Sequence, residues 1–154
     1  MKVILATHNQ GKIREFQKRF SEIGWEVIPI SDIADIPEPE ETGTTFRENA
    51  LQKARYYAGA VNLPVLSDDS GIIADVLGNE PGVYSARYAG EDKNSQANME
   101  KVLRLMKDKP DRSAQFRTAI SLILDGKKYL FEGIIRGQIT TEKRGEAGFG
   151  YDPI

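Results

Sequence analysis

The chain has 154 residues, with 21 Lys and Arg against 23 Asp and Glu, and its formal net charge of -2 argues against a general nucleic-acid binder. With 40% hydrophobic residues, a chain of this length can bury a real core and is expected to form a single domain. It has one His and no Cys, which excludes disulfides, thiolate metal sites, a Cys nucleophile and zinc sites made of several histidines.

The amino-terminal part of the chain predicts a strand, a helix and a second strand. The apolar run Lys2 to Ala6 predicts a buried strand. Apolar residues recur at helical spacing over Lys12 to Ile23, so an amphipathic helix is expected there, with Gly24 at its end. The run Trp25 to Pro29 predicts the second strand, and the acidic, proline-containing stretch 31–43 predicts a loop.

The middle of the chain predicts a second helix and two strand segments. Thr45 and Glu48 have the spacing of a capping box, so a helix should begin there. Residues Val65 to Asp68 predict a strand that runs into a loop at Asp69-Ser70-Gly71. The apolar residues of Ile72 to Leu77 then predict a further strand segment.

The remaining part of the chain predicts an irregular segment, a helix and a hairpin. Residues 78–90 are rich in glycine and without a period, whereas Ser95 to Lys107 carries apolar residues on one helical side. Two strand patterns, Ala114 to Leu124 and Lys127 to Ile135, flank the hairpin signal Asp125-Gly126. Helices combined with a parallel crossover and an antiparallel hairpin indicate an α/β or α+β domain with a mixed sheet.

No stretch of the sequence suits a membrane span or an export signal. The apolar runs Val3 to Ala6 and Ile120 to Leu124 are far shorter than the roughly 20 residues that a spanning helix needs. The apolar run after Lys2 is too brief for the core of a signal peptide. We therefore expect a cytoplasmic protein with neither a membrane nor a nucleic acid as its partner.

The turn from Thr7 to Lys12 is the first candidate site. It joins a strand to a helix through small and polar residues, so its backbone amides and the positive helix end could hold a phosphate, and Lys12 adds a formal charge. It is not a Walker A loop, because the leading glycine is missing and Ile13 stands where Ser or Thr belongs. The alternative is an ordinary helix cap followed by an exposed lysine.

Two acidic pairs, Glu40-Glu41 and Asp68-Asp69, are candidates for binding a hard cation such as Mg²⁺. Mg²⁺ usually takes one or two protein carboxylates and completes its shell with water and substrate phosphates. Because adjacent side chains of an extended chain point to opposite faces, one member of each pair should reach a common site and the other should be structural. The alternative for each pair is a helix cap or a solvated edge.

Lys53 and two aromatic residues have no clear role on their own. Lys53 follows Asn49 by one helical turn, so it either reaches the same anion as Lys12 or is a solvated helical lysine. Phe149 and Tyr151 are flanked by glycines, and they either stack on a base or belong to the core. Together with the turn and the acidic pairs, these residues suit a ligand that carries phosphates, a bound cation and a flat ring.

A series of short motifs follows the chain from end to end. The motifs are Ala6-Thr7-His8-Asn9-Gln10-Gly11-Lys12, Glu40-Glu41-Thr42-Gly43, Thr45-Phe46, Glu48-Asn49-Ala50, Lys53-Ala54, Asp68-Asp69-Ser70-Gly71, Pro81-Gly82-Val83-Tyr84-Ser85-Ala86-Arg87-Tyr88 and Gly148-Phe149-Gly150-Tyr151-Asp152-Pro153. In content and order they resemble the inosine/xanthosine triphosphate pyrophosphatases, a family that removes deaminated purine nucleotides from the nucleotide pool.

The resemblance implies an α/β fold with an elongated mixed sheet and helices that form two lobes around a nucleotide cleft, usually in a homodimer. It also implies Mg²⁺-dependent hydrolysis of inosine, deoxyinosine and xanthosine triphosphates to the monophosphate and pyrophosphate. An alternative within the same chemistry is a pyrophosphatase for modified pyrimidine or standard nucleotides.

The resemblance further implies roles for individual residues. Glu40 or Glu41, together with Asp69, would hold Mg²⁺, and Asp69 would also activate the attacking water. The implied substrate-binding residues are Thr7, His8, Asn9, Gln10, Gly11, Lys12, Lys53 and Ser70, with Phe149, Gly150, Tyr151 and Asp152 around the nucleoside and Phe149 against the base.

The family continues beyond the position of Ile154 through a lysine and a Ser-His-Arg motif that contact the nucleotide and its base. We therefore expect residues 1–154 to form a single pyrophosphatase domain that lacks this segment. The alternative function is that of a nucleotide-binding protein with impaired or no turnover, because groups that read the base would be missing.

Overall fold

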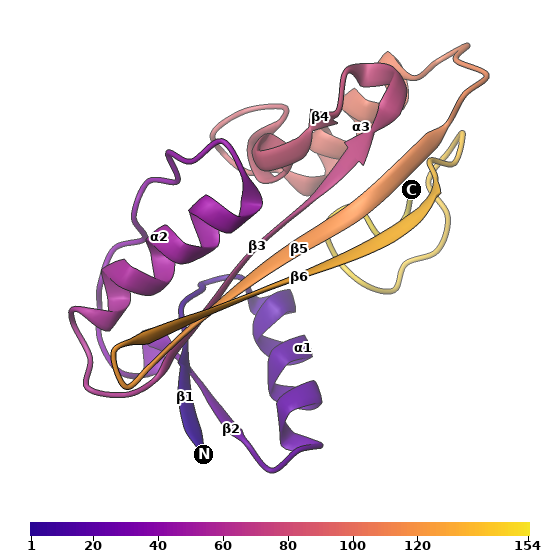
Figure 1. The fold of residues 1–154 in the computed structure, drawn as a ribbon. Coiled ribbons are helices and arrows are strands. Elements are labelled where there is room, and N and C mark those ends of the chain that lie inside the picture. Colours follow the sequence, from indigo (N-terminus) through magenta and orange to yellow (C-terminus); the bar gives the residue numbers. More distant parts are fainter. The chain divides into compact units, whose positions relative to one another are not determined.

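A six-stranded mixed sheet runs through the computed structural model, which describes residues 1–154 (Figure 1). Its strands are β1 (Lys2–Leu5), β2 (Glu26–Pro29), β3 (Val65–Ala74), β4 (Glu80–Pro81), β5 (Ser113–Leu124) and β6 (Lys127–Gln138). The helices are α1 (Gln10–Ser21), α2 (Phe46–Ala58) and α3 (Ser95–Leu105), with short 3-10 helices at Ile30–Asp32, Asp75–Leu77 and Gly82–Arg87.

The strands lie in the order β2-β1-β3-β5-β6, and β4 pairs with β3 outside this path. Strand β1 is parallel to both β2 and β3, whereas β4 is antiparallel to β3. The α/β class with a mixed sheet is therefore confirmed. None of the helices has the length and apolar composition that a membrane crossing requires.

The chain divides into two units. The first unit consists of Met1–Asp69 and Ala119–Glu132, and the second of Ser70–Thr118 and Gly133–Ile154.

In the first unit, α1 and α2 lie on either side of β1 (Figure 1). Val3 and Leu5 pack with Ile13 of α1 in one core cluster, whereas Ile4 packs with Tyr57 of α2 in another. A strand that is covered on both faces needs apolar residues at successive positions. This explains why the first strand reads as an unbroken apolar run.

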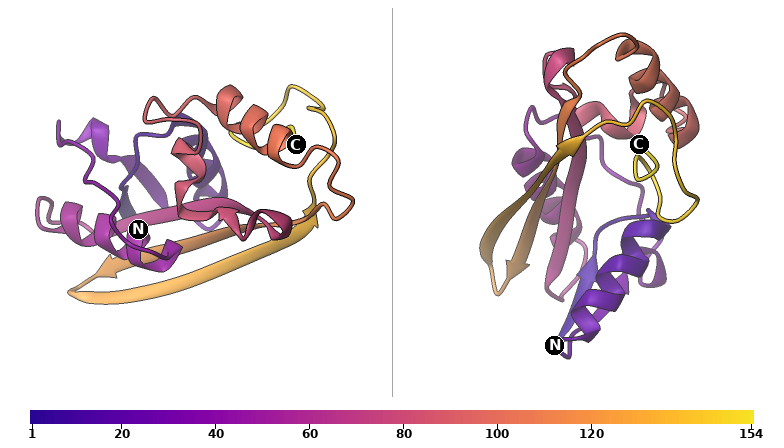
Figure 2. Two further views of the ribbon diagram at one scale, coloured as in Figure 1. Left: turned by 90° about the horizontal axis from the view of Figure 1, so that it is seen from above. Right: turned by 90° about the vertical axis from the view of Figure 1, so that its right-hand side faces the viewer.

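The second unit is built around α3. Met99, Val102 and Met106 on one side of this helix pack against Ile139 and Tyr151 in a single core cluster. Figure 2 shows α3 beside the C-terminal segment in both of its views. The apolar side that the sequence predicts for this helix is therefore the side that packs.

Both helices of the first unit begin at side-chain caps. Asn9 caps α1 by accepting a hydrogen bond from the Lys12 N–H, so the helix begins at Gln10, two residues earlier than predicted. It ends at Ser21, before the exposed Ile23, so the predicted end is wrong. Thr45 caps α2 at the predicted position by accepting from the Glu48 N–H.

The predicted loop at Asp69-Ser70-Gly71 is wrong, because β3 continues through it from Val65 to Ala74. The polar side chains of this stretch have partners on neighbouring elements. The Ser67 hydroxyl donates to the Ala50 carbonyl of α2, and the Ser70 and Thr118 hydroxyls lie 3.0 Å apart. Satisfied polar groups can remain inside a buried strand, so the polar run does not end it.

The hairpin is confirmed, with Asp125 and Gly126 at φ values of 51 and 74. Two successive residues with positive φ suit the type I′ turn that matches the twist of the two strands. Strand β6 extends to Gln138, beyond the predicted end at Ile135. The predicted irregular stretch 78–90 contains β4 and the whole 3-10 helix Gly82–Arg87.

Replacing Arg112 with Ala should destabilise the protein by about 2–4 kcal/mol. Its guanidinium donates to the carbonyls of Ile139 at 2.7 Å, Met106 at 2.9 Å and Thr140 at 2.6 Å, so the change leaves these acceptors without a charged donor. Urea unfolding measures the loss, and Arg104→Ala on the exposed side of α3 is the matched control. Equal losses in the two variants would contradict the expectation.

Candidate active site

Buried polar and charged side chains gather just after β1, on α2 and on the part of β3 that belongs to the first unit. Those below 9% exposure are Thr7, Asn49, Lys53, Ser67, Asp68 and Asp69. A buried charge is costly unless it is paired. The concentration of such groups in one small region therefore marks a site rather than ordinary packing.

The turn between β1 and α1 is bound to β3 through Lys12. The Lys12 Nζ lies 2.8 Å from the Asp68 Oδ2, and the Asp68 side chain is 1% exposed. Within the turn, the Thr7 hydroxyl accepts a hydrogen bond from the Asn9 N–H at 3.1 Å. The alternative of a freely exposed lysine after a helix cap is thus wrong, although the cap itself is present.

Lys53 forms the second ion pair of this region. Its Nζ lies 2.9 Å from the Glu41 Oε1, and its side chain is 4% exposed. Burial by itself lowers the pKa of the Lys53 ammonium, but the carboxylates of Asp68, Glu41 and Asp69 outweigh burial and raise this pKa overall. Lys53 is therefore a buried cation, and the alternative of a solvated helical lysine is wrong.

Asp69 is a carboxyl group with an unusual pKa. Burial, followed by the nearby charge of Glu41, raises the pKa of Asp69 to about 7, although Lys53, Asn49 and Lys12 act in the opposite direction. These groups lie on α1, on α2 and in the loop before α2, so these segments meet at β3 within the first unit.

The adjacent residues Asp68 and Asp69 have different partners, as the alternation of a strand requires. Asp68 binds Lys12, whereas Asp69 accepts a hydrogen bond from the Asn49 side chain at 3.1 Å. Both carboxylates nevertheless act on Lys53. Asp68 therefore lies next to the site and holds Lys12, which is compatible with the structural role expected for one member of the pair.

Glu41 and Asp69 have the chemistry of a magnesium site. No cluster of three or more His, Asp and Glu side chains is arranged to hold a metal ion. The two carboxylates are close enough to repel each other, since the charge of Glu41 raises the pKa of Asp69. A hard cation that keeps water and phosphate ligands needs no more than this pair and would relieve their repulsion, so the residues fit Mg²⁺. Glu40, in contrast, is exposed.

The other candidates in the turn after β1 differ in exposure. His8, Asn9 and Gln10 are exposed, whereas Gly11 is buried. The His8 Nε2 lies 3.5 Å from the hydroxyl of Tyr57. Burial, together with Glu38, raises the pKa of Tyr57 to about 12, so this hydroxyl stays protonated.

The candidates in the second unit have two kinds of environment. Phe149 and Gly150 are half-buried, and the Asp152 carboxylate accepts a hydrogen bond from the Phe149 N–H at 2.9 Å. Tyr151 is 8% exposed, lies in the core, and donates its hydroxyl to the Ser85 carbonyl at 2.6 Å. This favours a packing role for Tyr151, whereas the half-buried Phe149 still has surface that a ligand can contact.

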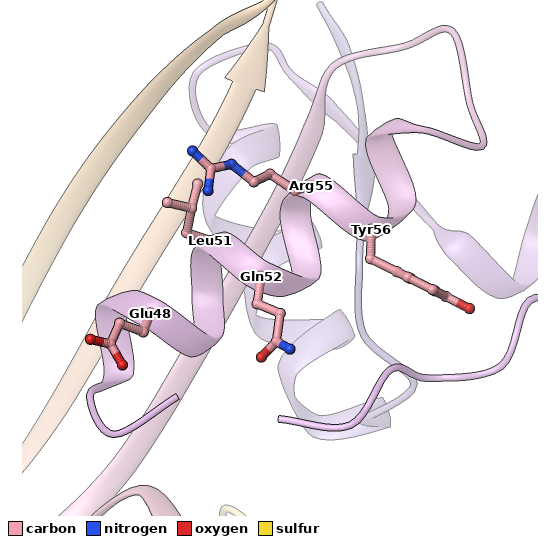
Figure 3. Close-up of a pocket in the computed structure, with 5 residues that line it drawn as sticks. All are labelled: Glu48, Leu51, Gln52, Arg55 and Tyr56. Atoms are coloured by element: carbon pink, nitrogen blue, oxygen red, sulfur yellow. The ribbon is translucent and has the colours of Figure 1, made fainter. Parts of the chain in front are cut away.

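An open hollow of about 550 Å³ lies on the outer side of α2 (Figure 3). It is lined by Glu48, Leu51, Gln52, Arg55 and Tyr56. Arg55 and Tyr56 are exposed, whereas Asn49 and Lys53 are buried, so the hollow lies on the solvent side of the helix and not at the charged site.

Sequence reasoning missed the contacts of two residues of the site. It did not foresee that the Asn49 amide donates to Asp69, or that Asp68 binds Lys12. The available signal was the one-turn spacing of Asn49 and Lys53 on α2, which predicts that they share a side of the helix. What each side chain contacts depends on the strand opposite, which that spacing does not describe.

Comparison with known proteins agrees with the arrangement of these motifs. The model of the Ham1 family matches residues 3–154. The chain is 51% identical over 154 residues to the dITP/XTP pyrophosphatase of Bacillus subtilis, covering 98% of this chain and 78% of that protein. It is 44% identical over 154 residues to the dITP/XTP pyrophosphatase of Flavobacterium johnsoniae, covering 100% and 80%.

Solved structures show the same likeness. The Staphylococcus aureus Ham1 protein superposes with a TM-score of 0.85 at 46% identity, covering 100% of this chain and 80% of that one. A HAM1 protein from Coxiella burnetii gives a TM-score of 0.88 at 39% identity, with the same coverage.

Proposed function

The chain belongs to the Ham1 family, and from that premise we propose that it hydrolyses the triphosphates of inosine, deoxyinosine and xanthosine to the monophosphate and pyrophosphate. The observation that carries this proposal is the meeting of Lys12 and Lys53 with Glu41 and Asp69 in one buried region. The substrate class is supported by the relatives named dITP/XTP pyrophosphatase.

The cations of the site bind the triphosphate. Lys12 pairs with Asp68 and Lys53 pairs with Glu41. When a triphosphate binds, its phosphate oxygens replace these carboxylates as partners of the two lysines. Thr7 and the amides of Gln10 and Gly11 at the start of α1 add donors at the positive end of the helix, which the Asn9 cap precedes. His8, Gln10 and Ser70 are further proposed contacts of the substrate.

Glu41 and Asp69 are the carboxylates that would hold Mg²⁺, while the exposed Glu40 remains in solvent. Bound Mg²⁺ supplies neutralisation of the charge on the phosphate oxygens. Asp69 positions the attacking water and accepts its proton at a carboxylate oxygen.

The segment Phe149 to Asp152 binds the nucleoside, with the Phe149 ring against the base. Its support is local, since the Asp152 carboxylate fixes the Phe149 backbone and the buried Tyr151 anchors the segment in the core. Stacking does not distinguish hypoxanthine from adenine. Selectivity therefore requires polar groups that read the 6-oxo edge of the base.

The test is incubation with inosine triphosphate and Mg²⁺, with the phosphorus products resolved. We expect pyrophosphate, and release of orthophosphate in its place would exclude cleavage between the α and β phosphates. Nucleotide binding by calorimetry without any turnover would favour a binding protein instead. Competition with standard purine and pyrimidine triphosphates separates the proposed substrates from the alternatives.

We also propose that residues 1–154 act as one pyrophosphatase domain, and that this domain works in the cytoplasm, where free nucleotides are found. We further propose that the protein forms a homodimer. The support for dimerisation is the edge strand β6, on which Tyr129, Phe131, Ile134 and Ile135 are exposed at 41%, 57%, 47% and 74%. Apolar residues on an unpaired edge are a liability unless a partner covers them. Sedimentation equilibrium decides the point, and a monomer at all concentrations would contradict it.

A further inference from the structure

The loop before α2 is bound to the side chains of that helix residue by residue. The contacts pair Glu41 with Lys53, Thr42 with Gln52, Gly43 with Asn49 and Thr44 with Glu48. The loop belongs to no strand and therefore has no ladder of backbone hydrogen bonds. Its shape, and with it the place of Glu41, depends on these side chains of α2.

Asn49 differs from the other three residues of α2 because it also hydrogen-bonds to β3. Its Oδ1 accepts the Gly43 N–H at 2.8 Å, and its Nδ2 donates to the Asp69 Oδ2 at 3.1 Å. The residue is 1% exposed, so neither end of the amide can exchange its partner for bulk water. The N–H of Gly43 requires the oxygen at one end, which places the NH₂ group at Asp69.

Gly43 is fitted closely to this amide. A Cβ added at Gly43 would lie 2.6 Å from the Asn49 Oδ1 and 2.7 Å from the Glu48 Cβ, closer than van der Waals contact allows. The loop backbone can reach Asn49 only because residue 43 has no side chain. The contact can therefore be broken from the loop as well as from the helix.

We infer that Asn49 is a positioning residue that sets the separation between Glu41 and Asp69, so that both carboxylates can bind one divalent cation. The inference rests on the proposed function for the identity of these ligands. Lys53 also acts on both carboxylates, but an ammonium group is a point charge and does not fix the direction of its partners. The planar amide of Asn49, in contrast, sets both a distance and an orientation.

Two variants break this link from opposite sides. Asn49→Ala removes the amide, and Gly43→Ala pushes the loop away from it while leaving the buried helix side intact. Gln52→Ala is the matched control, because Gln52 holds the same loop through Thr42 but makes no hydrogen bond to Asp69. Circular dichroism and thermal unfolding establish that each variant is folded before it is compared.

Three readouts are measured on the same preparations. Hydrogen exchange at residue 43 on metal-free protein should accelerate in both test variants. Binding of Mn²⁺ to the nucleotide-free protein, followed by electron paramagnetic resonance, should weaken by about 10–100-fold. The value of kcat with inosine triphosphate should fall by a similar factor, with a smaller change in KM, whereas Gln52→Ala should stay within about twofold of the parent in Mn²⁺ binding and kcat.

The inference is overturned if either folded test variant binds Mn²⁺ as tightly as the parent. It is also overturned if Gln52→Ala weakens Mn²⁺ binding as much as they do, because any loosening of the loop would then suffice. If Asn49→Ala does not fold, Gly43→Ala alone decides. A parent protein without pyrophosphatase activity would refute the proposed function, while the Mn²⁺ measurement would still judge Asn49.

Discussion

Replacing Asp69 with Asn should lower turnover by roughly 10²–10⁴-fold and, at the same time, make the folded protein more stable above neutral pH. The loss of turnover follows from removal of the group that accepts the proton of the attacking water. The gain in stability follows from its burial, since an ionised carboxylate with 5% exposure beside Glu41 is unfavourable in the folded state.

The sign of the pH dependence follows from the direction of the shift. The pKa of Asp69 is raised from 3.8 to about 7, so the folded protein keeps a proton that the unfolded chain releases between these values. The stability that the protonated Asp69 contributes is fully present below the pKa of this group in the unfolded chain, and it is lost as the pH rises through about 7. One pKa unit corresponds to about 1.4 kcal/mol, so Asp69→Asn should recover up to about 4 kcal/mol above that pH and nothing near pH 4.

Urea unfolding of the parent and the variant across this pH range measures the effect in the absence of divalent cations. Asp35→Asn is the matched control, because Asp35 is exposed in the same unit and should show no such dependence. A destabilised Asp69→Asn above neutral pH would mean that Lys53, Asn49 and Lys12 stabilise the ionised Asp69 carboxylate by more than its burial costs. Unchanged turnover would remove Asp69 from the proposed mechanism.

Replacing Lys53 with Met should destabilise the protein by about 3–5 kcal/mol and remove its activity. The ammonium of Lys53 is buried among Asp68, Glu41 and Asp69, and the change leaves these carboxylates without their shared cation. The cost is expected at neutral pH and above, where the carboxylates are ionised, and it should shrink as acid protonates them. The free energy of unfolding by urea, measured across pH, checks both statements.

Addition of Mg²⁺ should recover more stability in Lys53→Met than in the parent, because a bound cation would replace part of the missing charge. Lys18→Met on the exposed side of α1 is the control and should change neither stability nor its response to Mg²⁺. An equally small effect of both substitutions would show that the buried ion pair contributes little to the fold.

Much of the fold could be predicted from local patterns. The apolar run after Lys2, the cap at Thr45 and the Asp125-Gly126 turn each specify a backbone conformation through neighbours in the chain, and each is confirmed. The region Asp69 to Gly71 could not be predicted in this way. Its residues are typical of a loop, and only their partners on other elements keep them in a strand.

The sequence by itself determined which chemical groups are available to this protein: a polar turn with a lysine, two acidic pairs, a second lysine and an aromatic between glycines. Only the tertiary structure decided that Glu41 rather than Glu40 lies at Lys53, that Asp68 binds Lys12, and that Asn49 joins the loop to Asp69. The reason is physical. Composition and the spacing of apolar residues are local properties of the chain, whereas ion pairs and pKa values depend on charges that the fold brings close together from α1, α2, β3 and the loop before α2.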